Sequence, residues 1–223
     1  GGMSATAQLY LTSSGDYTIG GLIGDNSGWD ATNPSVALGG GVGNHDYTIN
    51  VATGNSFSTS ATISGPGYGE GQLIKSGAGE QTLSGTISSL GDFTGSPGII
   101  VTAGKLTLSS TSNSFDAGVE IRGGTLSVSN DGNLGSVPGT VDEDNIIFNG
   151  GALEFTGTDT INSNRGITMT GAGTINVTSS NTLTYGGSIV GSGNITKSGS
   201  GSLLLSGTSR SYSGDITVDG GTL

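Results

Sequence analysis

The sequence predicts an all-β fold, a parallel β-solenoid of roughly ten coils. Three features lead to this prediction: a glycine-rich composition, short segments of alternating polarity, and internal repeats. Of the 223 residues, 45 are glycine and only 31% are hydrophobic. A single compact core at this length needs more aliphatic and aromatic bulk, so we expect a thin core with many side chains facing outwards.

Short strands are predicted wherever apolar and small polar residues alternate between glycines. In chain order these segments are residues 47–51, 73–75, 106–108, 126–128, 146–148 and 182–184. Helix is expected to be nearly absent, because no long stretch free of glycine and β-branched runs has apolar residues at a spacing of 3.6. The same periodicity argues against a disordered, low-complexity chain.

Two phrases recur along the chain. The longer one, residues 71–85, returns 122 residues later at residues 193–207 with eight of fifteen positions identical. The shorter one reads apolar, any, apolar, any, small, Gly, any, Leu, and it occupies residues 99–106, 119–126, 146–153 and 216–223. Its first three copies start 20 and 27 residues apart, a period that suits one coil of a solenoid. We expect glycines at the corners and ladders of serine and threonine on the outward faces.

These phrases carry a family resemblance. Residues 193–207, followed by Tyr212-Ser213-Gly214 and by residues 216–223, closely resemble the passenger-associated transport repeat, also called the autotransporter-associated β-strand repeat. Residues 123–135 and 149–153 look like the segments that join such repeats, and the resemblance extends over about residues 61–223. It implies a right-handed, single-stranded parallel β-helix in a long protein that is secreted by, or lies on the surface of, a Gram-negative type bacterium. The repeat is a scaffold, so the resemblance says little about activity.

The chain is expected to divide at residue 60. Residues 1–60 fit the repeat less well and are expected to form irregular coils or a cap, with the passenger-type helix over residues 61–223. The last phrase continues into strand residues in its other copies, so we expect the helix to be truncated at Leu223, with signal and translocator outside this segment. An uncovered end predicts end-to-end self-association. Tandem immunoglobulin-like sandwiches fit less well, because they need larger inward aromatics and a longer period.

Charge and composition exclude several functions. The net charge of −11 disfavours nucleic acid and anionic lipid as partners. No apolar run has the length of a membrane-spanning helix, so no membrane insertion of this segment is expected. With no cysteine and one histidine, the chain cannot form disulfides, thiolate metal sites or a multi-histidine centre, and no cofactor is expected.

Two groups of residues are candidates for chemistry. His45 and Asp46 suggest acid–base catalysis, but neighbours on a strand face opposite ways and the chain has no Gly-x-Ser-x-Gly elbow, so a solvated loop histidine is the better interpretation. Asp142, Glu143 and Asp144, together with Asn145, have the oxygen ligands that a Ca²⁺ ion prefers. This run lacks the spacing of an EF-hand, and we expect a solvated acidic loop.

Glycine runs and repeated lysines are expected to be structural. Residues 39–43 and 65–69 imitate phosphate-binding loops in composition only, because neither ends in Gly-Lys-Ser/Thr or precedes a helix, so they are interpreted as turns. Lys75 and Lys197 share one position of the longer phrase, which predicts a structural role with the aliphatic stem along the coil surface and the ammonium in water. We therefore assign no catalytic, cofactor-binding or metal-binding residue.

Three functions fit a protein of this kind. The first is a structural or adhesive module that displays an extended surface to glycan, host or matrix. The second is a carbohydrate-active β-helix enzyme, a polysaccharide lyase or hydrolase, but Arg122, Arg165 and Arg210 are scattered in the sequence. The third is an ice- or mineral-binding face, which needs Thr-x-Thr on successive coils, and residues 158–160 and 182–184 have no third member. We predict the first, without enzymatic activity and outside the cell or on its surface.

Overall fold

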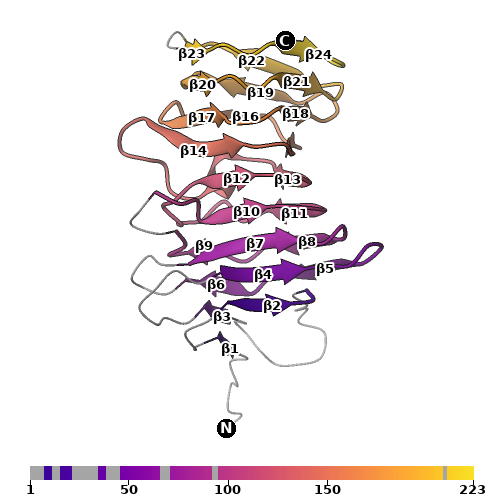
Figure 1. Cartoon of the computed structure of the whole chain (residues 1–223), viewed down its shortest axis with the longest axis vertical. Coiled ribbons are helices and arrows are strands. Elements are labelled where there is room, and N and C mark those ends of the chain that lie inside the picture. Colours follow the sequence, from indigo (N-terminus) through magenta and orange to yellow (C-terminus); the bar gives the residue numbers. More distant parts are fainter. Residues whose placement is uncertain are drawn as a thin grey trace.

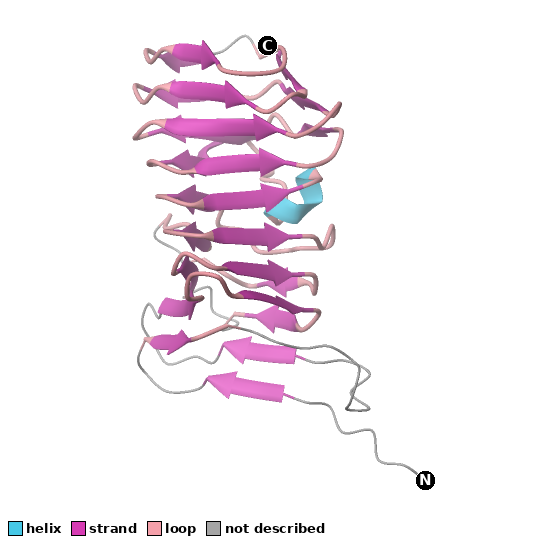
Figure 2. Cartoon of the chain, turned by 90° about the vertical axis from the view of Figure 1, so that its right-hand side faces the viewer, coloured by secondary structure: helices cyan, strands magenta, loops and turns pink. Residues whose placement is uncertain are grey.

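The chain winds into a rod of stacked coils, with strands of successive coils lying side by side (Figure 1). The computed structural model describes residues 8–11, 16–21, 35–38, 46–65, 71–91, 95–207 and 210–223. Every strand pair in the sheets is parallel, for example Ile99 to Val101 beside Val119 to Ile121. A coil with three strands contributes one strand to each of the three sides of the rod. Figure 2 shows the rod from a second direction.

Two sides of the rod are continuous sheets. Side 1 has nine strands: β2 (Tyr17–Ile19), β4 (Asp46–Asn50), β7 (Gln72–Ser76), β10 (Ile99–Val101), β12 (Val119–Ile121), β14 (Asp142–Phe148), β17 (Arg165–Met169), β20 (Ile189–Gly191) and β23 (Arg210–Tyr212). Side 2 has eight strands: β5 (Ser56–Thr59), β8 (Glu80–Leu83), β11 (Lys105–Leu108), β13 (Thr125–Val128), β15 (Ala152–Phe155), β18 (Gly173–Val177), β21 (Ile195–Ser198) and β24 (Ile216–Val218). The backbone pairing of each coil is thus supplied by the coils before and after it.

Side 3 is split into two shorter sheets. The first contains β1 (Gln8–Leu11), β3 (Ser35–Leu38), β6 (Thr62–Ser64) and β9 (Ile87–Ser88), and the second contains β16 (Asp159–Ile161), β19 (Thr182–Tyr185) and β22 (Ser202–Leu205). Between them lies η1 (Asp131–Leu134), a single turn of 3-10 helix drawn in cyan in Figure 2. It is the helical element of the described residues, and none of these residues forms a helix able to cross a membrane.

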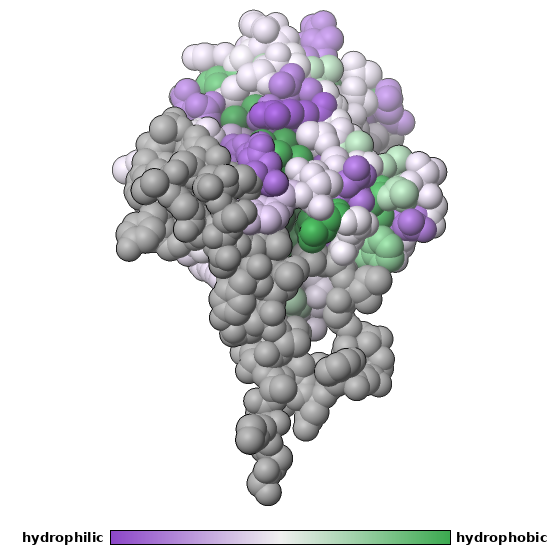
Figure 3. All heavy atoms as spheres, turned by 60° about the horizontal axis from the view of Figure 1, so that its bottom comes forward, coloured by the Kyte–Doolittle hydropathy of each residue, from purple (hydrophilic) through white to green (hydrophobic). Residues whose placement is uncertain are grey.

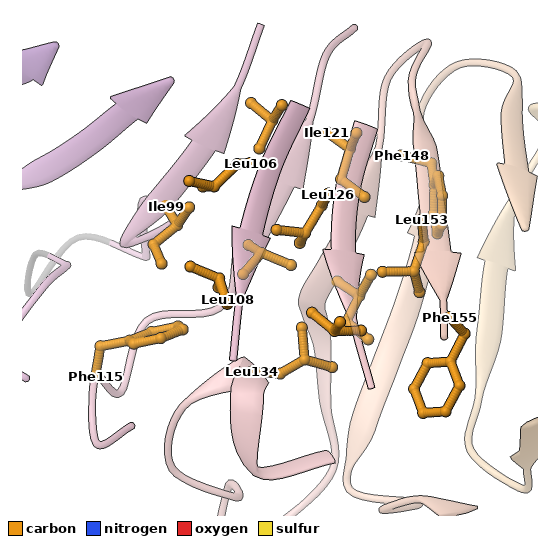
Figure 4. Packing of buried hydrophobic residues seen from close by; sticks show 14 of the residues in the cluster. Ile99, Leu106, Leu108, Phe115, Ile121, Leu126, Leu134, Phe148, Leu153 and Phe155 are labelled. Atoms are coloured by element: carbon orange, nitrogen blue, oxygen red, sulfur yellow. The ribbon is translucent and has the colours of Figure 1, made fainter. Parts of the chain in front are cut away.

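Inward-facing aliphatic and aromatic side chains stack along the rod axis and form the core. Leu106, Leu126 and Leu153 occupy the same register position on three successive strands of side 2, and each is at most 1% exposed. Figure 4 shows these leucines facing Ile121 and Phe148 of side 1 across the interior. Because each strand gives the core only one or two residues, a chain with few apolar residues can still bury a continuous core.

The predicted fold class is confirmed: the protein is an all-β, parallel β-solenoid. Its longest sheet has nine strands, slightly fewer than the roughly ten coils expected. The predicted strands at residues 73–75, 106–108, 126–128, 146–148 and 182–184 lie within β7, β11, β13, β14 and β19. Residues 46–59 already form β4 and β5, which pair directly with β7 and β8, and the division at residue 60 stays a prediction.

The two copies of the longer phrase lie at different corners of the rod. Residues 71–85 run from side 1 to side 2 through β7 and β8, whereas residues 193–207 run from side 2 to side 3 through β21 and β22. The shorter phrase behaves in the same way, because its first three copies begin in side 1 and its fourth begins in β24 of side 2. The repeated sequence therefore specifies a type of corner and not a particular side.

Side-chain amides connect neighbouring coils where side 3 is interrupted. Asn113 accepts a hydrogen bond from the Ile87 amide at 2.9 Å and donates one to the Asn133 carbonyl at 2.9 Å. Asn133 in turn donates to the Ser110 carbonyl at 2.9 Å and accepts from the Asn130 amide. These amides replace part of the strand pairing that the other two sides obtain from the backbone.

Arg165 is buried next to the same interruption of side 3. Its Nε donates to Asp131 Oδ1 at 2.9 Å, and its Nη atoms donate to the carbonyls of Leu134, Gly135 and Ser136 at 2.7 to 3.1 Å. The side chain is fully enclosed, so a charge-assisted network holds the turn after η1 against β17.

Candidate binding surface

The outward residues of side 2 form an almost uninterrupted polar surface along the rod. Strand register places them in two ladders, one residue per coil, because outward positions alternate with core positions along each strand. One ladder is Ser56, Glu80, Lys105, Thr125, Ala152, Thr174, Thr196 and Thr217, and the other is Ser58, Thr82, Thr107, Ser127, Glu154, Asn176 and Ser198. We call these two ladders the polar face.

The expectation of hydroxyl ladders is confirmed on the polar face. Thr174, Thr196 and Thr217 lie in register on three successive strands, and Thr82 lies beside Thr107. Threonine is favoured here because its branched side chain suits a strand while its hydroxyl faces the solvent. The result is a row of hydroxyl groups repeated at the strand spacing of about 4.8 Å.

A charged cluster sits in the middle of the polar face. Lys105 and Glu154 form an ion pair across the intervening strand β13, and Ser127 donates to the same carboxylate oxygen at 2.8 Å. Asn176 Nδ2 lies 3.4 Å from the other oxygen. Burial alone raises the pKa of Glu154, but the hydrogen bonds and the positive charge of Lys105 lower it overall.

The outward residues of side 1 are chemically different. Register aligns Ile74, Ile100, Glu120, Ile147 and Val190 with other residues in one outward ladder. Ile100 is 1% exposed and Glu120 is 8% exposed, so the centre of this ladder is covered. Figure 3, which tilts the lower end of the rod towards the viewer, shows hydrophobic residues on the coloured part of that surface as small green areas between polar ones. Side 2 therefore offers the longer polar surface.

His45 and Asp46, considered above as an acid–base pair and interpreted as a solvated loop, lie only partly within the described residues. His45 lies outside them, and Asp46 begins β4, where its backbone amide donates to Asp16 Oδ1 at 3.1 Å. The interpretation of His45 as a solvated loop residue stays a prediction.

The acidic run at residues 142–145 opens strand β14. Asn145 donates to Asp142 Oδ2 at 3.1 Å, and the Asp144 amide donates to Asp142 Oδ1 at 3.2 Å. Glu143 and Asp144 are exposed. Within the described ranges, no group of three or more histidine, cysteine, aspartate or glutamate side chains has an arrangement that could hold a metal ion. Asp142 and Asn145 are thus hydrogen-bonded within the run, and its solvated state stays a prediction.

The arginines have separate structural roles. Arg122 directly follows β12, at the C-terminal end of the side 1 strands, and its side chain bonds Glu120 at 2.9 Å. Arg165 begins β17, at the N-terminal end of these strands, and is buried. Burial alone raises the pKa of Glu120, but the Arg122 and Asn149 hydrogen bonds and the Arg122 charge lower it overall. Arg210 begins β23, and its side chain lies outside what the structure describes.

The expected position of the two repeated lysines is wrong. Lys75 and Lys197 are both 0% exposed, so their ammonium groups are inside the protein and not in water. Each takes an inward position of the core ladder, Lys75 between Ile49 and Val101 and Lys197 beside Ile175. Burial lowers the pKa of both ammonium groups. Sequence alternation marks both positions as inward, but the preference of lysine for water argues for the surface.

Each lysine reaches three backbone carbonyls. Lys75 Nζ donates to the carbonyls of Ser76 at 2.6 Å, Gly77 at 2.9 Å and Ala103 at 3.2 Å. Lys197 Nζ donates to the matching carbonyls of Ser198 at 2.7 Å, Gly199 at 3.1 Å and Gly220 at 3.0 Å. The predicted structural role is thus carried by the charged end of the side chain and not by its stem.

The remaining candidates are turns and short ladders. Residues 39–43 lie outside the described part of the chain, as does most of 65–69. In side 3, Thr160 is in register with Thr184, and the next strand places Leu204 there, so this threonine ladder ends after two members. The sequence analysis missed Glu154 and Asn176 as parts of one surface, because each occurs once and their proximity depends on register.

The fold and surface define a class of protein: a parallel β-solenoid of corner repeats with a long polar side. Comparison with known families gives the same class. The family model described as passenger-associated-transport-repeat matches residues 73–106, 102–128 and 195–223. These ranges contain both repeated lysines, and residues 129–194 between them lie outside the match. The chain therefore carries passenger-associated transport repeats in these ranges and is similar there to an autotransporter passenger segment.

A curated relative agrees with this assignment. The adhesin BmaC autotransporter of Brucella suis biovar 1 (strain 1330) is 40% identical over 146 residues, which is 62% of this chain. The chain spans about 4% of the length of that protein. No solved structure gave a significant match. The relative and the repeats support the predicted location outside the cell or on its surface.

Proposed function

We propose that this chain is a structural and adhesive segment of a much longer exported protein, and that its polar face binds a glycan or another hydroxyl-rich surface of host or matrix. The observation that carries this proposal is the polar face itself, which extends over all eight strands of side 2. Hydroxyl, amide and carboxylate groups at regular spacing suit the many hydroxyl groups of a polysaccharide. The adhesin name of the relative supports the same function.

A scaffold fits the described charged residues better than an enzyme. Lys75, Lys197 and Arg165 are buried and bonded to backbone carbonyls, and Arg122 is paired with Glu120. A polysaccharide lyase needs basic side chains gathered at the substrate, and a hydrolase needs a pair of carboxylates there. The proposal of a non-enzymatic role therefore rests on the use of these cationic side chains in contacts within the protein. End-to-end association stays a prediction, and the last described coil exposes Ile216, Val218 and Leu223.

A glycan array with the purified chain, with and without calcium and with product release measured in parallel, tests the proposed function. Saturable binding without product is expected, whereas depolymerised product or no binding would contradict it. A matched pair of variants locates the surface. The double variant Thr174→Val and Thr196→Val removes two hydroxyls from the polar face, and Thr160→Val with Thr184→Val removes two from side 3.

Valine keeps the branched shape of threonine, so both double variants should fold as the parent does. Loss of two hydrogen bonds should weaken binding by roughly tenfold or more for the side 2 pair. The side 3 pair should bind as the parent does. Equal effects of the two pairs would show that the polar face is not the binding surface.

A further inference from the structure

The repeated lysines belong to a three-coil unit that occurs twice in the rod. In both copies the corner shortens from coil to coil, from six residues to four and then to three. Aligned strand residues define these corners: Ile49 to Ser56, Lys75 to Glu80 and Val101 to Lys105 in the first copy, and Ile175 to Thr182, Lys197 to Ser202 and Val218 to Thr222 in the second. The same four residues, Thr-Ile-Asn-Val, span the start of the first corner in each copy, at residues 48–51 and 174–177.

Backbone hydrogen bonds tie the lysine corner to the coil before it. The Gly79 amide donates to the Val51 carbonyl at 2.9 Å, and the Gly201 amide donates to the Val177 carbonyl at 2.9 Å. This bond has the same length and position in the two copies, although the first copy lies between sides 1 and 2 and the second between sides 2 and 3. The unit is therefore independent of the side on which it sits.

The lysine itself reaches the coil that follows. Two of its three acceptors, such as Ser76 and Gly77, belong to its own corner, and the third, Ala103 or Gly220, belongs to the corner of the next coil. In both copies the residue after this third acceptor is a glycine with positive φ, Gly104 at +65° and Gly221 at +70°. A Cβ atom there would lie 2.9 Å from the lysine Nζ and under 2.3 Å from a backbone carbonyl oxygen.

We propose that Lys75 and Lys197 are latches between coils: each completes the hydrogen bonding of its buried ammonium only when the following coil docks, and so couples the stability of the two coils. An ammonium group has three donors, and a buried donor without an acceptor is costly. Before the next coil docks, the two carbonyls of its own corner satisfy two donors. Arrival of the next corner supplies the third and encloses the charge. Each lysine therefore couples its coil to the C-terminal neighbour and not to the preceding coil.

Amide hydrogen exchange on the full 223-residue chain tests the latch. Lys75→Met keeps most of the apolar volume and removes the ammonium, while Arg122→Met removes a partly exposed cation outside the polar face as a control. In the Lys75→Met variant, exchange at Thr102 and Lys105, which bond to the lysine coil, should rise by about tenfold or more. The Gly79 amide, which bonds to the preceding coil, should change less. Lys197→Met should have the matching effect at Asp219 and Thr222.

An equal rise on both sides of the lysine coil, or no rise beyond that of the control, would overturn the proposal. A second measurement separates charge from volume. The chain has no cysteine, so a Lys75→Cys variant can be alkylated at one site in denaturant and refolded. Bromoethylamine places an ammonium at nearly the reach of lysine, and iodoethane places an ethyl group there that has no hydrogen-bond donor.

Only the ammonium product should restore slow exchange at Thr102 and Lys105. Recovery with both reagents would show that volume and not charge matters, and would overturn the latch. Recovery with neither, while the parent chain refolds after the same treatment, would also overturn it. Because the readout is local exchange, this result is independent of whether the polar face binds a ligand.

Discussion

The continuous sides of the rod and the interrupted side 3 are stabilised in different ways. Sides 1 and 2 stack nine and eight strands and are held by backbone pairing over an aliphatic core. Side 3 breaks between β9 and β16, and there Asn113, Asn133 and Arg165 supply the hydrogen bonds. A solenoid therefore tolerates irregular coils where buried polar side chains substitute for a neighbouring strand. Four predictions test this difference between the sides, in order of decreasing effect.

Replacing Arg165 should have the largest effect. Arg165→Met removes the donors to residues 134–136 and leaves the Asp131 carboxylate without its ion-pair partner, so the free energy of unfolding should fall by about 3–5 kcal/mol. Urea unfolding followed by circular dichroism measures it. Arg122→Met is the control, because the Arg122 side chain is 47% exposed, and it should cost less than about 1 kcal/mol. Equal losses would mean that the interruption does not depend on Arg165.

A core change on a continuous side should come next. Leu126→Ala opens a cavity between Leu106 and Leu153, with an expected loss of about 3 kcal/mol. The neighbouring Thr125→Ala changes an outward residue and should cost under about 1 kcal/mol. Calorimetric melting of the two variants compares them. If both lower the melting temperature equally, the core of side 2 is not what stabilises these coils.

Asn133 should have an intermediate effect. Asn133→Ala leaves the amides of Ser129 and Asn130 and the carbonyl of Ser110 without their side-chain partner, at a cost of about 1–3 kcal/mol. Asn176→Ala on the polar face is the matched control and should cost less, because its amide contact with Glu154 is long. Exchange at Ser129 and Asn130 should rise only in Asn133→Ala. Unchanged exchange there would contradict the role given to Asn133.

The smallest expected effect is on the loss of stability at acidic pH. The pKa of both Glu120 and Glu154 is lowered below the ordinary 4.5 in the folded protein, so their contribution to stability is present above pH 4.5 and is lost as the pH falls through the folded pKa. The double variant Glu120→Gln and Glu154→Gln should therefore lose less stability than the parent between about pH 5 and pH 3. Unfolding at several pH values measures both slopes. Identical slopes would show that other carboxylates account for the acid response.

The class of fold and the period of its coils can be predicted from the amino-acid sequence alone. Alternation around Leu106, Leu126 and Ile146 marks inward positions, and the two phrases mark corners, because a coil needs an apolar residue inside and a glycine at each turn. Those signals are local. Side chains within a few residues of each other carry them, and they do not depend on which coil comes next.

The positions of the polar groups depend on how the coils pack against one another. Lys75 and Lys197 lie at the same position of the longer phrase. Their ammonium groups are buried in the protein because backbone carbonyls of two different coils surround each of them. Glu154 meets Lys105 through register across three strands, 49 residues apart. The side on which a repeat falls also depends on the number of residues in every corner before it. These outcomes depend on contacts between coils, which no single stretch of sequence encodes.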